Sequence, residues 1–286
     1  MGLFDRKEEI CANLVYSNKD FPIRYQIKQK TLLVFNGNTM NEVNADIILR
    51  IDSWEKNNEG YAVSVVTEKQ ESTTSSPVMK DLMQFLNRFN EPLTHLLFQL
   101  NEKSKPIRLL NQSEIDNKWV ALRDGELSAY KEEKITNDII IAWDTDFANI
   151  FPLVYNNILY KLFFTPIYGP KKSYNPKYDK TNIVSTLFQG STIELLIGEG
   201  ILDISDLGIN IEHIGLGSIN DYRKIEKNYN DGYKKIVEAP LSYEYNYKAG
   251  YSFNNNGVMT KCNAEIQEKA SEKVISTQSY SISILQ

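Results

Sequence analysis

Alternation of apolar and polar residues near both ends of the chain is the feature that most constrains its fold. In the first stretch the alternation covers residues 23–27, 45–51 and 61–65. Because successive side chains of a strand point to opposite faces, this period of two predicts strands with one apolar face. Asn36-Gly37 and the run 57–60 separate these segments, and Asn and Gly adopt the positive φ of tight turns at low cost. We therefore predict a three-stranded meander over residues 20–71.

A second alternating stretch closes the chain. Apolar and polar residues alternate at 241–247 and 280–284, and Asn255-Asn256-Gly257 marks a turn between them. Short apolar runs broken by glycines precede this stretch from residue 192 onward. The segment 222–238 contains Asn-Asp-Gly, which is typical of a hairpin turn, so we expect two strands there rather than one helix. These signals predict a C-terminal meander over residues 190–286.

The middle of the chain, residues 76–165, has the spacing of helices. Ser76 is suited to cap a helix that starts at Pro77, and apolar residues recur at helical spacing up to Phe89. Pro92 predicts either a kink or a second helix over 93–100. Further helices are expected over 113–122 and 147–164, and Pro152 falls in the first two turns of the last one. The short apolar run 139–143 predicts a strand.

The order of strands, helices and strands favours an α+β fold with antiparallel strands over a βαβ nucleotide-binding fold. Neither of the two predicted meanders is stable alone, since each has one apolar face to bury. We therefore expect a single α+β domain over residues 1–286. In it, one large curved antiparallel sheet is built from the N- and C-terminal meanders and is covered by the central helices.

The composition limits the classes of function. Hydrophobic residues make up 42% and charged residues 24%, which is typical of a globular protein, and the net charge of −5 argues against a dedicated nucleic-acid binder. The N-terminus leads into charged residues rather than an apolar signal segment, and no run of about 18 apolar residues predicts a membrane-spanning helix. The two cysteines suggest no disulfide framework. We expect a cytoplasmic protein, and the frequent Asn, Lys, Ile and Tyr are typical of an AT-rich bacterial source.

The segment IIIAWDTDF, residues 139–147, carries the sharpest motif of the chain. Two carboxylates two residues apart, Asp144 and Asp146, can share a hard divalent cation. The segment resembles the Asp-x-Asp motif of haloacid-dehalogenase-type phosphatases and that of nucleotide-sugar glycosyltransferases. That resemblance implies phosphoryl or glycosyl transfer with a metal ion. We favour the simpler interpretation, in which Asp144, Thr145 and Asp146 precede a helix and cap its first N–H groups.

Two other polar features are weaker. The segment GEGILDISDLGINIEH, residues 198–213, gathers carboxylates, but Glu212 and His213 face opposite sides of a strand, so we expect solvated carboxylates there. A Ser-His-Asp or Cys-His site would have to use His95 or His213, because the chain has only two histidines. No Gly-x-Ser-x-Gly motif surrounds any serine.

The loop YGPKKSYNPKYDK interleaves lysines with tyrosines, side chains that can grip phosphates or stack on a partner. Pro170 and Pro176 predict that it is extended. A solvated loop is the simpler interpretation, but this is the surface segment that we would test first for partner contact. The candidate partner-binding residues are Lys171, Lys172, Tyr174, Lys177 and Tyr178.

The apolar helices offer a last candidate site. Helices laid on a curved sheet can enclose a groove for an apolar ligand or a peptide, although an ordinary packed core explains the same residues. The candidate groove residues are Phe147, Phe151, Tyr155 and Phe163.

These observations favour a binding protein without enzymatic activity of its own, such as an adaptor, accessory or immunity-type component of a bacterial assembly. No convergent catalytic motif is visible in a chain of 286 residues, which argues against an enzyme. We expect a protein partner and no cofactor. The alternatives are a metal-dependent hydrolase or transferase that uses Asp144 and Asp146, or a carrier of an apolar ligand.

Overall fold

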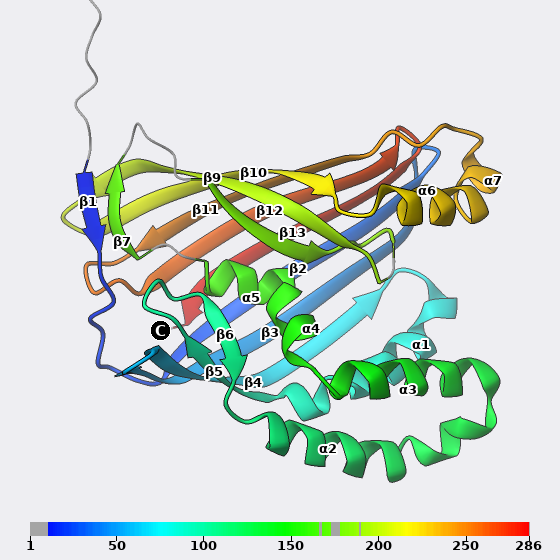
Figure 1. Cartoon of the computed structure of the whole chain (residues 1–286), viewed down its shortest axis with the longest axis horizontal. Coiled ribbons are helices and arrows are strands. Elements are labelled where there is room, and N and C mark those ends of the chain that lie inside the picture. The colour runs from blue at the N-terminus through cyan, green and yellow to red at the C-terminus, as the bar shows by residue number, and fades with distance from the viewer. Residues whose placement is uncertain (1–10, 166–167, 173–177, 189, 286) are drawn as a thin grey trace, which may run out of the picture. The chain divides into compact units, whose positions relative to one another are not determined.

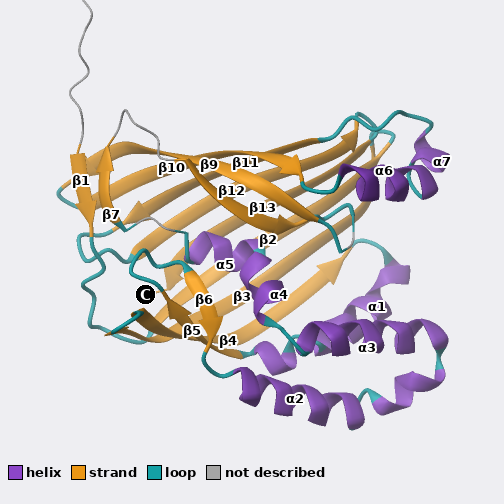
Figure 2. Cartoon of the chain, in the orientation of Figure 1, coloured by secondary structure: helices purple, strands orange, loops and turns teal. Residues whose placement is uncertain are grey.

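The computed structural model describes residues 11–165, 168–172, 178–188 and 190–285, and the chain divides into two compact units (Figure 1). The first unit comprises residues 20–166 and 282–286, and the second comprises residues 1–19 and 167–281. Figure 2 shows that strands dominate and that helices form a smaller share. Within the described residues, eleven strands take part in the main antiparallel ladders. The coarser prediction of a sheet-rich α+β chain with antiparallel strands is therefore confirmed.

Five strands of the first unit pair in the order β6-β5-β4-β3-β2. The three strands that come first along the chain, between residues 23 and 74, confirm the predicted N-terminal meander, with turns at Asn36-Gly37 and at residues 58–59. Tyr25, Ile27 and Leu49 on these strands are at most 2% exposed. The five strands are β2 (Ile23–Phe35), β3 (Asn38–Asn57), β4 (Gly60–Thr74), β5 (His95–Leu100) and β6 (Pro106–Leu109).

The helices of the first unit lie between residues 77 and 163. They are α1 (Pro77–Arg88), α2 (Gln112–Asp124), α3 (Lys134–Phe147), α4 (Phe151–Asn156) and α5 (Ile158–Phe163), with 3-10 helices at Glu91–Leu93 and Ser128–Glu132. As predicted, α1 starts at Pro77 after Ser76, although the Ser76 side chain makes no capping hydrogen bond. Pro152 lies in the first turn of α4, where its missing N–H costs little.

Two local predictions in this unit were wrong. The segment expected as a helix over 93–100 is strand β5, because Leu96, Phe98 and Leu100 alternate on one face and pair with β4. The apolar run 139–143 lies in α3 rather than in a strand. There Ile140 is 2% exposed while Ile141 is 55% exposed, and burial recurs at Phe147, seven residues on, which is helical periodicity. Short apolar runs carry no clear period, so tertiary pairing decided both cases.

The second unit holds six strands in the order β13-β12-β11-β10-β9-β8 and a separate pair, β1-β7. Of the strand predicted over 241–247, residues 244–247 lie in β11 and residues 241–243 precede it, and the turn at Asn255-Asn256-Gly257 is confirmed. The elements of this unit are β1 (Cys11–Leu14), β7 (Gly169–Lys172), β8 (Tyr178–Val184), β9 (Thr192–Ser205), β10 (Gly208–Ile219), α6 (Tyr222–Asp231), α7 (Lys234–Val237), β11 (Glu244–Phe253), β12 (Met259–Ser271) and β13 (Val274–Leu285).

The prediction of two strands over 222–238 was wrong, because the segment forms α6 and α7. The Asp221 side chain accepts a hydrogen bond from the Lys224 N–H at 3.1 Å and caps α6, which ends before Gly232. Ile225 and Tyr229, four residues apart, are the buried residues of this helix. The Asn-Asp-Gly sequence thus ends a helix instead of turning a hairpin.

A row of aromatic side chains on β11 forms much of the core of the second unit. Tyr245, Tyr247 and Tyr251 are at most 4% exposed, and burial raises the pKa of all three phenols. Gly215 and Gly217 on β10 make room for these rings, since a Cβ at Gly217 would lie 2.7 Å from the Tyr245 Cβ. Glycine is needed on this face because neighbouring aromatic rings fill the space of a side chain.

Candidate functional site

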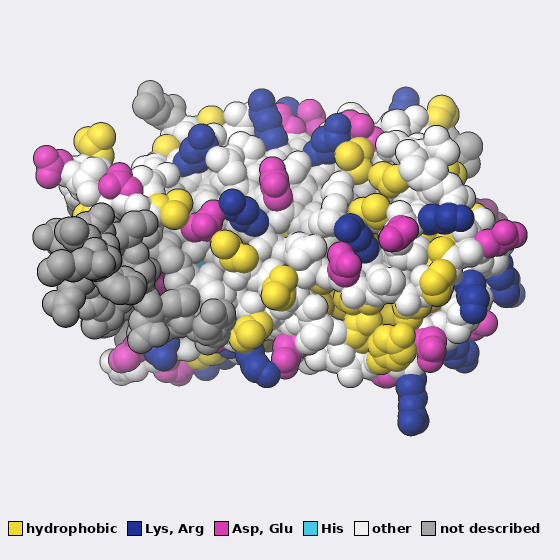
Figure 3. Space-filling model, turned by 90° about the horizontal axis from the view of Figure 1, so that it is seen from above, with side chains coloured by type: hydrophobic (Ala, Val, Ile, Leu, Met, Phe, Trp, Pro, Cys, Tyr) yellow, Lys and Arg dark blue, Asp and Glu magenta, His cyan; other side chains and the backbone are white. Residues whose placement is uncertain are grey.

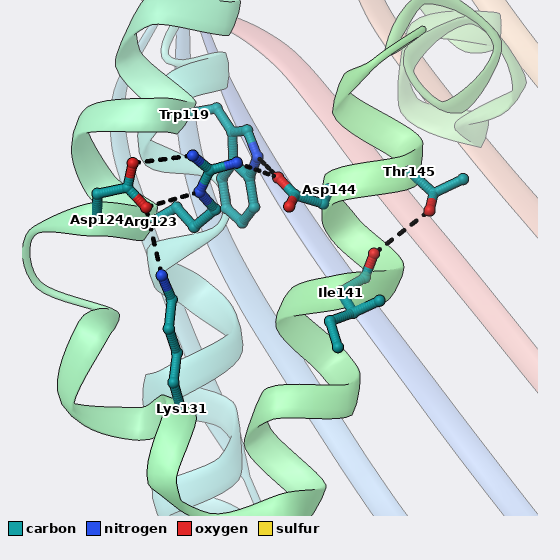
Figure 4. A network of polar contacts seen from close by, with 7 residues as sticks. All are labelled: Trp119, Arg123, Asp124, Lys131, Ile141, Asp144 and Thr145. Carbon is teal, nitrogen blue, oxygen red and sulfur yellow. Dashed lines mark hydrogen bonds and ion pairs between the residues drawn. The ribbon is translucent and has the colours of Figure 1, made fainter.

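Asp144 is engaged in a network that joins α2 and α3 (Figure 4). Its Oδ1 accepts a hydrogen bond from Trp119 Nε1 at 2.7 Å and one from Arg123 at 2.8 Å. Arg123 also donates two hydrogen bonds to the carboxylate of Asp124. These hydrogen bonds lower the pKa of the Asp124 carboxyl to about 2. The carboxylate of Asp144 therefore holds two helices together, and it lies in the last turns of α3 rather than ahead of a helix.

Asp146 lies two residues further along α3. Residues two apart on a helix point to different sides, so the two carboxylates do not converge. Asp146 is an exposed residue, and partial desolvation raises the pKa of its carboxyl above its usual value of 3.8. Among the residues that the structure describes, no group of three or more His, Cys, Asp or Glu side chains is placed to hold a metal ion. A metal site at Asp144 and Asp146 stays a prediction, and this geometry does not favour it.

The four candidate groove residues lie in α3, α4 and α5. Phe147 is 1% exposed and stacks on Trp119 with ring centroids 4.4 Å apart. Phe151 and Tyr155 stack on each other at 5.5 Å, and Phe163 contacts Tyr25 of β2 edge-on at 5.1 Å. Each ring thus packs on another ring of the first unit, and the groove stays a prediction.

The lysine- and tyrosine-rich segment is described only at its two ends. Lys171 and Lys172 lie in β7, where they pair with β1, and Tyr178 begins β8. Tyr174 and Lys177 lie outside the described residues. The backbone at both ends is therefore strand, where an extended loop was expected, and the binding role of these five residues stays a prediction.

Strands β9 and β10 pair as a hairpin (Figure 1), and many of its apolar side chains are exposed. Of the seventeen large hydrophobic residues that are exposed in the described part of the chain, six lie on this one hairpin. Leu196 and Leu216 are paired across the two strands and are 40% and 66% exposed, and Leu207 at the turn is 86% exposed. The six residues, here called the hairpin apolar set, are Leu196, Leu202, Ile204, Leu207, Ile214 and Leu216.

The same hairpin is acidic. Residues 192–219 contain five carboxylates and no lysine or arginine. Glu194 and Glu212 form ion pairs with Lys180 and Lys248 of the neighbouring strands, both at 3.0 Å. Asp203 and Asp206 are exposed at the tip, and neither has an ion-pair partner within the described residues. The tip of the hairpin therefore combines exposed apolar side chains with negative charge.

One acidic residue of this hairpin is not solvated, contrary to the expectation for residues 198–213. Glu199 points to the inner face of the sheet, where its Oε2 lies 3.1 Å from Nε2 of His213. The His213 side chain is 3% exposed and the Glu199 side chain 14% exposed. The pairing follows from the register, in which His213 lies opposite Glu199. Glu212 points to the other face, as predicted.

Three polar side chains meet on the first unit where β4, β5 and α2 adjoin. Ser64 Oγ on β4 lies 3.2 Å from His95 Nε2 on β5, and His95 Nδ1 lies 3.5 Å from Glu114 Oε2 on α2. Glu114 also accepts hydrogen bonds from Lys118 at 2.6 Å and from Asn111 at 3.3 Å. These contacts, led by that of Lys118, lower the pKa of Glu114 to about 2.

The buried carboxylate of Glu268, in the second unit, is held by hydrogen bonds from other parts of the chain. Glu268 on β12 is fully buried and accepts hydrogen bonds from Ser185 Oγ, from the Tyr243 hydroxyl and from the backbone N–H and hydroxyl of Thr186. These donors come from the segment after β8 and from the residue before β11. Glu268 therefore anchors a connection to the sheet, with its oxygens occupied by protein donors.

Sequence reasoning missed three features. They are the contact of Ser64 with His95 and Glu114, the hairpin apolar set, and the Glu199–His213 pair. One signal was available for the hairpin, since its run of apolar and acidic residues contains no basic residue. The other two join positions far apart in sequence, and only strand register brings them together.

Comparison with known proteins adds little to this picture. No protein-family model and no curated protein matches the chain. Among solved structures, the chain is similar to lipovitellin, studied for its lipid–protein interactions, with 7% identity over 93% of this chain and a TM-score of 0.49. The chain spans 25% of the lipovitellin chain. An outer-membrane channel from Pseudomonas putida F1 has 7% identity over 94% of this chain and 98% of its own, with a TM-score of 0.18. Both likenesses are too weak to carry an argument.

Proposed function

We propose that this chain is a binding protein whose β9–β10 hairpin docks onto a partner protein. The observation that carries the proposal is the hairpin apolar set, which places six exposed large apolar side chains on residues 192–219 of a 286-residue chain. Single exposed apolar residues are ordinary on a protein surface, whereas a concentration of them on one element marks an interaction site. On the face seen in Figure 3, hydrophobic side chains lie singly among charged ones over much of the surface and gather into a larger group at the right.

The charge of the hairpin defines the chemistry of the partner. Leu202, Ile204 and Leu207 alternate with Asp203 and Asp206 at the tip, and all five are exposed. A complementary surface has an apolar pocket for the leucines and lysines or arginines at its rim. The negative charge also disfavours docking on an anionic surface such as nucleic acid. An adaptor or accessory component of a bacterial assembly, working in the cytoplasm, fits this chemistry.

The binding role is tested by purifying the chain gently from its host and weighing the complex by native mass spectrometry. We expect one discrete partner protein on the wild type, and its loss from a Leu207→Ser variant. The matched control is Met40→Ser, because Met40 is also an apolar residue near a hairpin turn and is 60% exposed. A bare wild-type chain, or a partner that stays on both variants, contradicts the proposal. A double variant, Asp203→Lys with Asp206→Lys, tests the charge. If this double variant loses the partner and the Leu207→Ser chain keeps it, binding depends on charge alone.

We further propose that α4 and α5 cover the apolar face of the first unit's strands. Phe163 of α5 lies against Tyr25 of β2, and Phe164, which follows α5, lies 4.8 Å from Phe98 of β5 between ring centroids. Among the described residues, none of the helices is both long and apolar enough to cross a lipid bilayer. The ring contacts of Phe163 and Phe164 with β2 and β5 are what support the proposed packing.

A further inference from the structure

We propose that Ser64, His95 and Glu114 form an acyl-transfer site that hydrolyses small carboxylic esters. This inference goes beyond the binding role and does not depend on it. The three side chains have the order of nucleophile, base and orienting carboxylate that activates a serine hydroxyl. Their separations are 3.2 Å from Ser64 Oγ to His95 Nε2 and 3.5 Å from His95 Nδ1 to Glu114 Oε2.

The two ring nitrogens of His95 face different groups. Nδ1 faces a carboxylate that accepts hydrogen bonds, which favours the tautomer with its proton on Nδ1. Nε2 is then an acceptor, and the Ser64 hydroxyl donates its proton toward it. This is the arrangement in which a histidine can remove a proton from an attacking serine.

Glu114 is held in place from two sides. Its Oε1 accepts from Lys118, and its Oε2, the oxygen that faces His95, also accepts from Asn111 Nδ2. Asn111 is itself tied to β5, because its Nδ2 donates to the His95 carbonyl at 3.0 Å and its Oδ1 accepts from the Leu97 N–H at 2.9 Å. Glu114 also lies in the first turn of α2, where the helix dipole favours a negative charge. The carboxylate therefore stays ionised and oriented.

The strand geometry presents Ser64 at an irregular point of the sheet. Its partner strand β3 changes register at this position, so that Ile51 pairs with Val65 and Ser53 pairs with Ser64. The extra residue makes a β-bulge, a feature that re-aims side chains and is frequent next to active sites. Ser64 is only partly buried and the His95 side chain is 35% exposed, so a small substrate can reach both.

The reaction conserves atoms and protons. Ser64 Oγ attacks the ester carbonyl carbon and its proton passes to His95 Nε2. The bond from the carbonyl carbon to the alcohol oxygen breaks, and His95 returns the proton to the departing alcohol. Water then attacks the acyl group on Ser64, His95 takes a proton from that water, and the carboxylic acid leaves as Ser64 regains its hydrogen. Glu114 is a positioning residue, because it acts through His95.

A fluorophosphonate probe tests the nucleophile directly on the full chain. Attack by Ser64 forms an Oγ–P bond and releases fluoride. Cleavage after Lys and Arg separates Ser64, in the peptide 57–69, from its strand neighbour Ser53, in the peptide 51–56, so Ser53 is an internal control. We expect Ser64 to be labelled at least tenfold faster than Ser53 in the folded chain and at the same rate after unfolding. Equal labelling of the two serines in the folded chain overturns the proposal.

The variants His95→Gln and Glu114→Gln test the partners, with p-nitrophenyl acetate hydrolysis as a second readout. Removing the base should lower the labelling and hydrolysis rates by about 100-fold or more. Glu114→Gln should lower both rates, and Glu114→Asp, which keeps the carboxylate, should restore part of the loss. If a folded His95→Gln chain keeps the wild-type labelling and hydrolysis rates, the contacts among Ser64, His95 and Glu114 are structural only. That result overturns the proposal. If either variant fails to fold, the Ser64-to-Ser53 labelling ratio of the wild type decides alone.

Discussion

The Trp119 indole N–H donates a hydrogen bond to Asp144 Oδ1 across 2.7 Å, and this contact joins α2 to α3 (Figure 4). The Asp144→Asn substitution removes the charge that Arg123 faces while keeping an acceptor for the indole. Since the Arg123 and Asp144 side chains are 26% and 42% exposed, we expect a loss of only about 0.5–1.5 kcal/mol in the free energy of unfolding. Urea denaturation measures it, with Asp138→Asn on the same helix as control.

The same variant tests the metal-dependent alternative. If Asp144 is a structural residue, Mg²⁺ and Mn²⁺ leave the melting temperature of wild type and variant unchanged. A rise of several degrees in the wild type that is absent from Asp144→Asn would instead establish a cation site.

Replacing Glu268 by Gln should be among the most destabilising polar substitutions in the second unit. The carboxylate accepts hydrogen bonds from donors that include the Thr186 N–H at 2.7 Å, and a carboxamide would turn an N–H group toward some of them. We expect a loss of about 2–5 kcal/mol in unfolding free energy. Glu265→Gln, at an exposed position three residues earlier, should change stability by less than about 0.5 kcal/mol. Equal effects of the two substitutions would contradict the anchoring role.

The Asp146→Asn substitution should stabilise the chain at neutral pH. Asp146 is an exposed residue, but partial desolvation raises the pKa of its carboxyl above 3.8, so the folded chain holds this proton slightly more tightly than the unfolded chain does. Its contribution to stability is fully present below pH 3.8 and is lost as the pH rises through the folded-state pKa. We therefore expect a higher melting temperature for the variant at pH 7 and no difference below pH 3.8. A lower melting temperature at pH 7 would show that the carboxylate has a stabilising partner.

Gly217 should not tolerate a side chain. A Cβ at this position would lie 2.7 Å from the Tyr245 Cβ and 2.8 Å from Ile193 Cγ2, and neither atom is at the flexible end of a side chain. Gly217→Ala should cost about 1–3 kcal/mol of unfolding free energy through overpacking. Gly200→Ala on β9 is the matched control, since nothing lies within 4 Å of its Cβ, and it should be neutral or slightly stabilising.

Phe147 and Phe151 distinguish a packed core from a groove for an apolar ligand. Phe147→Ala should cost about 3–5 kcal/mol, because the ring is 1% exposed and stacks on Trp119. Phe151→Ala should cost less, since its ring is only partly buried. Native mass spectrometry should find no lipid on the wild type or on either variant. A lipid that leaves with Phe151→Ala would establish the groove instead.

Much of the secondary structure could be predicted because its signals are local. The strands over 23–35, 38–57 and 60–74 follow from alternation and from the Asn-Gly turn, and α1 follows from Pro77 and the spacing of its apolar residues. The predictions failed where a local signal has two solutions. The segment HLLFQL fits either a buried strand or a helix, and the Asn-Asp-Gly at 230–232 fits either a hairpin or a helix end.

The candidate site was much less predictable than the fold. The sequence directed attention to Asp144 and to the lysine- and tyrosine-rich segment, because their residues are close along the chain. Asp144 instead faces Arg123 and Trp119, partners that no local pattern indicates. A carboxylate's role depends on which charges and donors surround it, and these come from other elements.

By itself, the sequence determined the antiparallel, strand-rich class of this protein, since period and turn chemistry act between neighbours along the chain. It also set the acidic and apolar character of residues 192–219. Only the tertiary structure decided that Leu196 and Leu216 lie side by side and that Ser64 lies beside His95. Strand register sets these contacts, and a shift of one residue would send the same side chains to opposite faces.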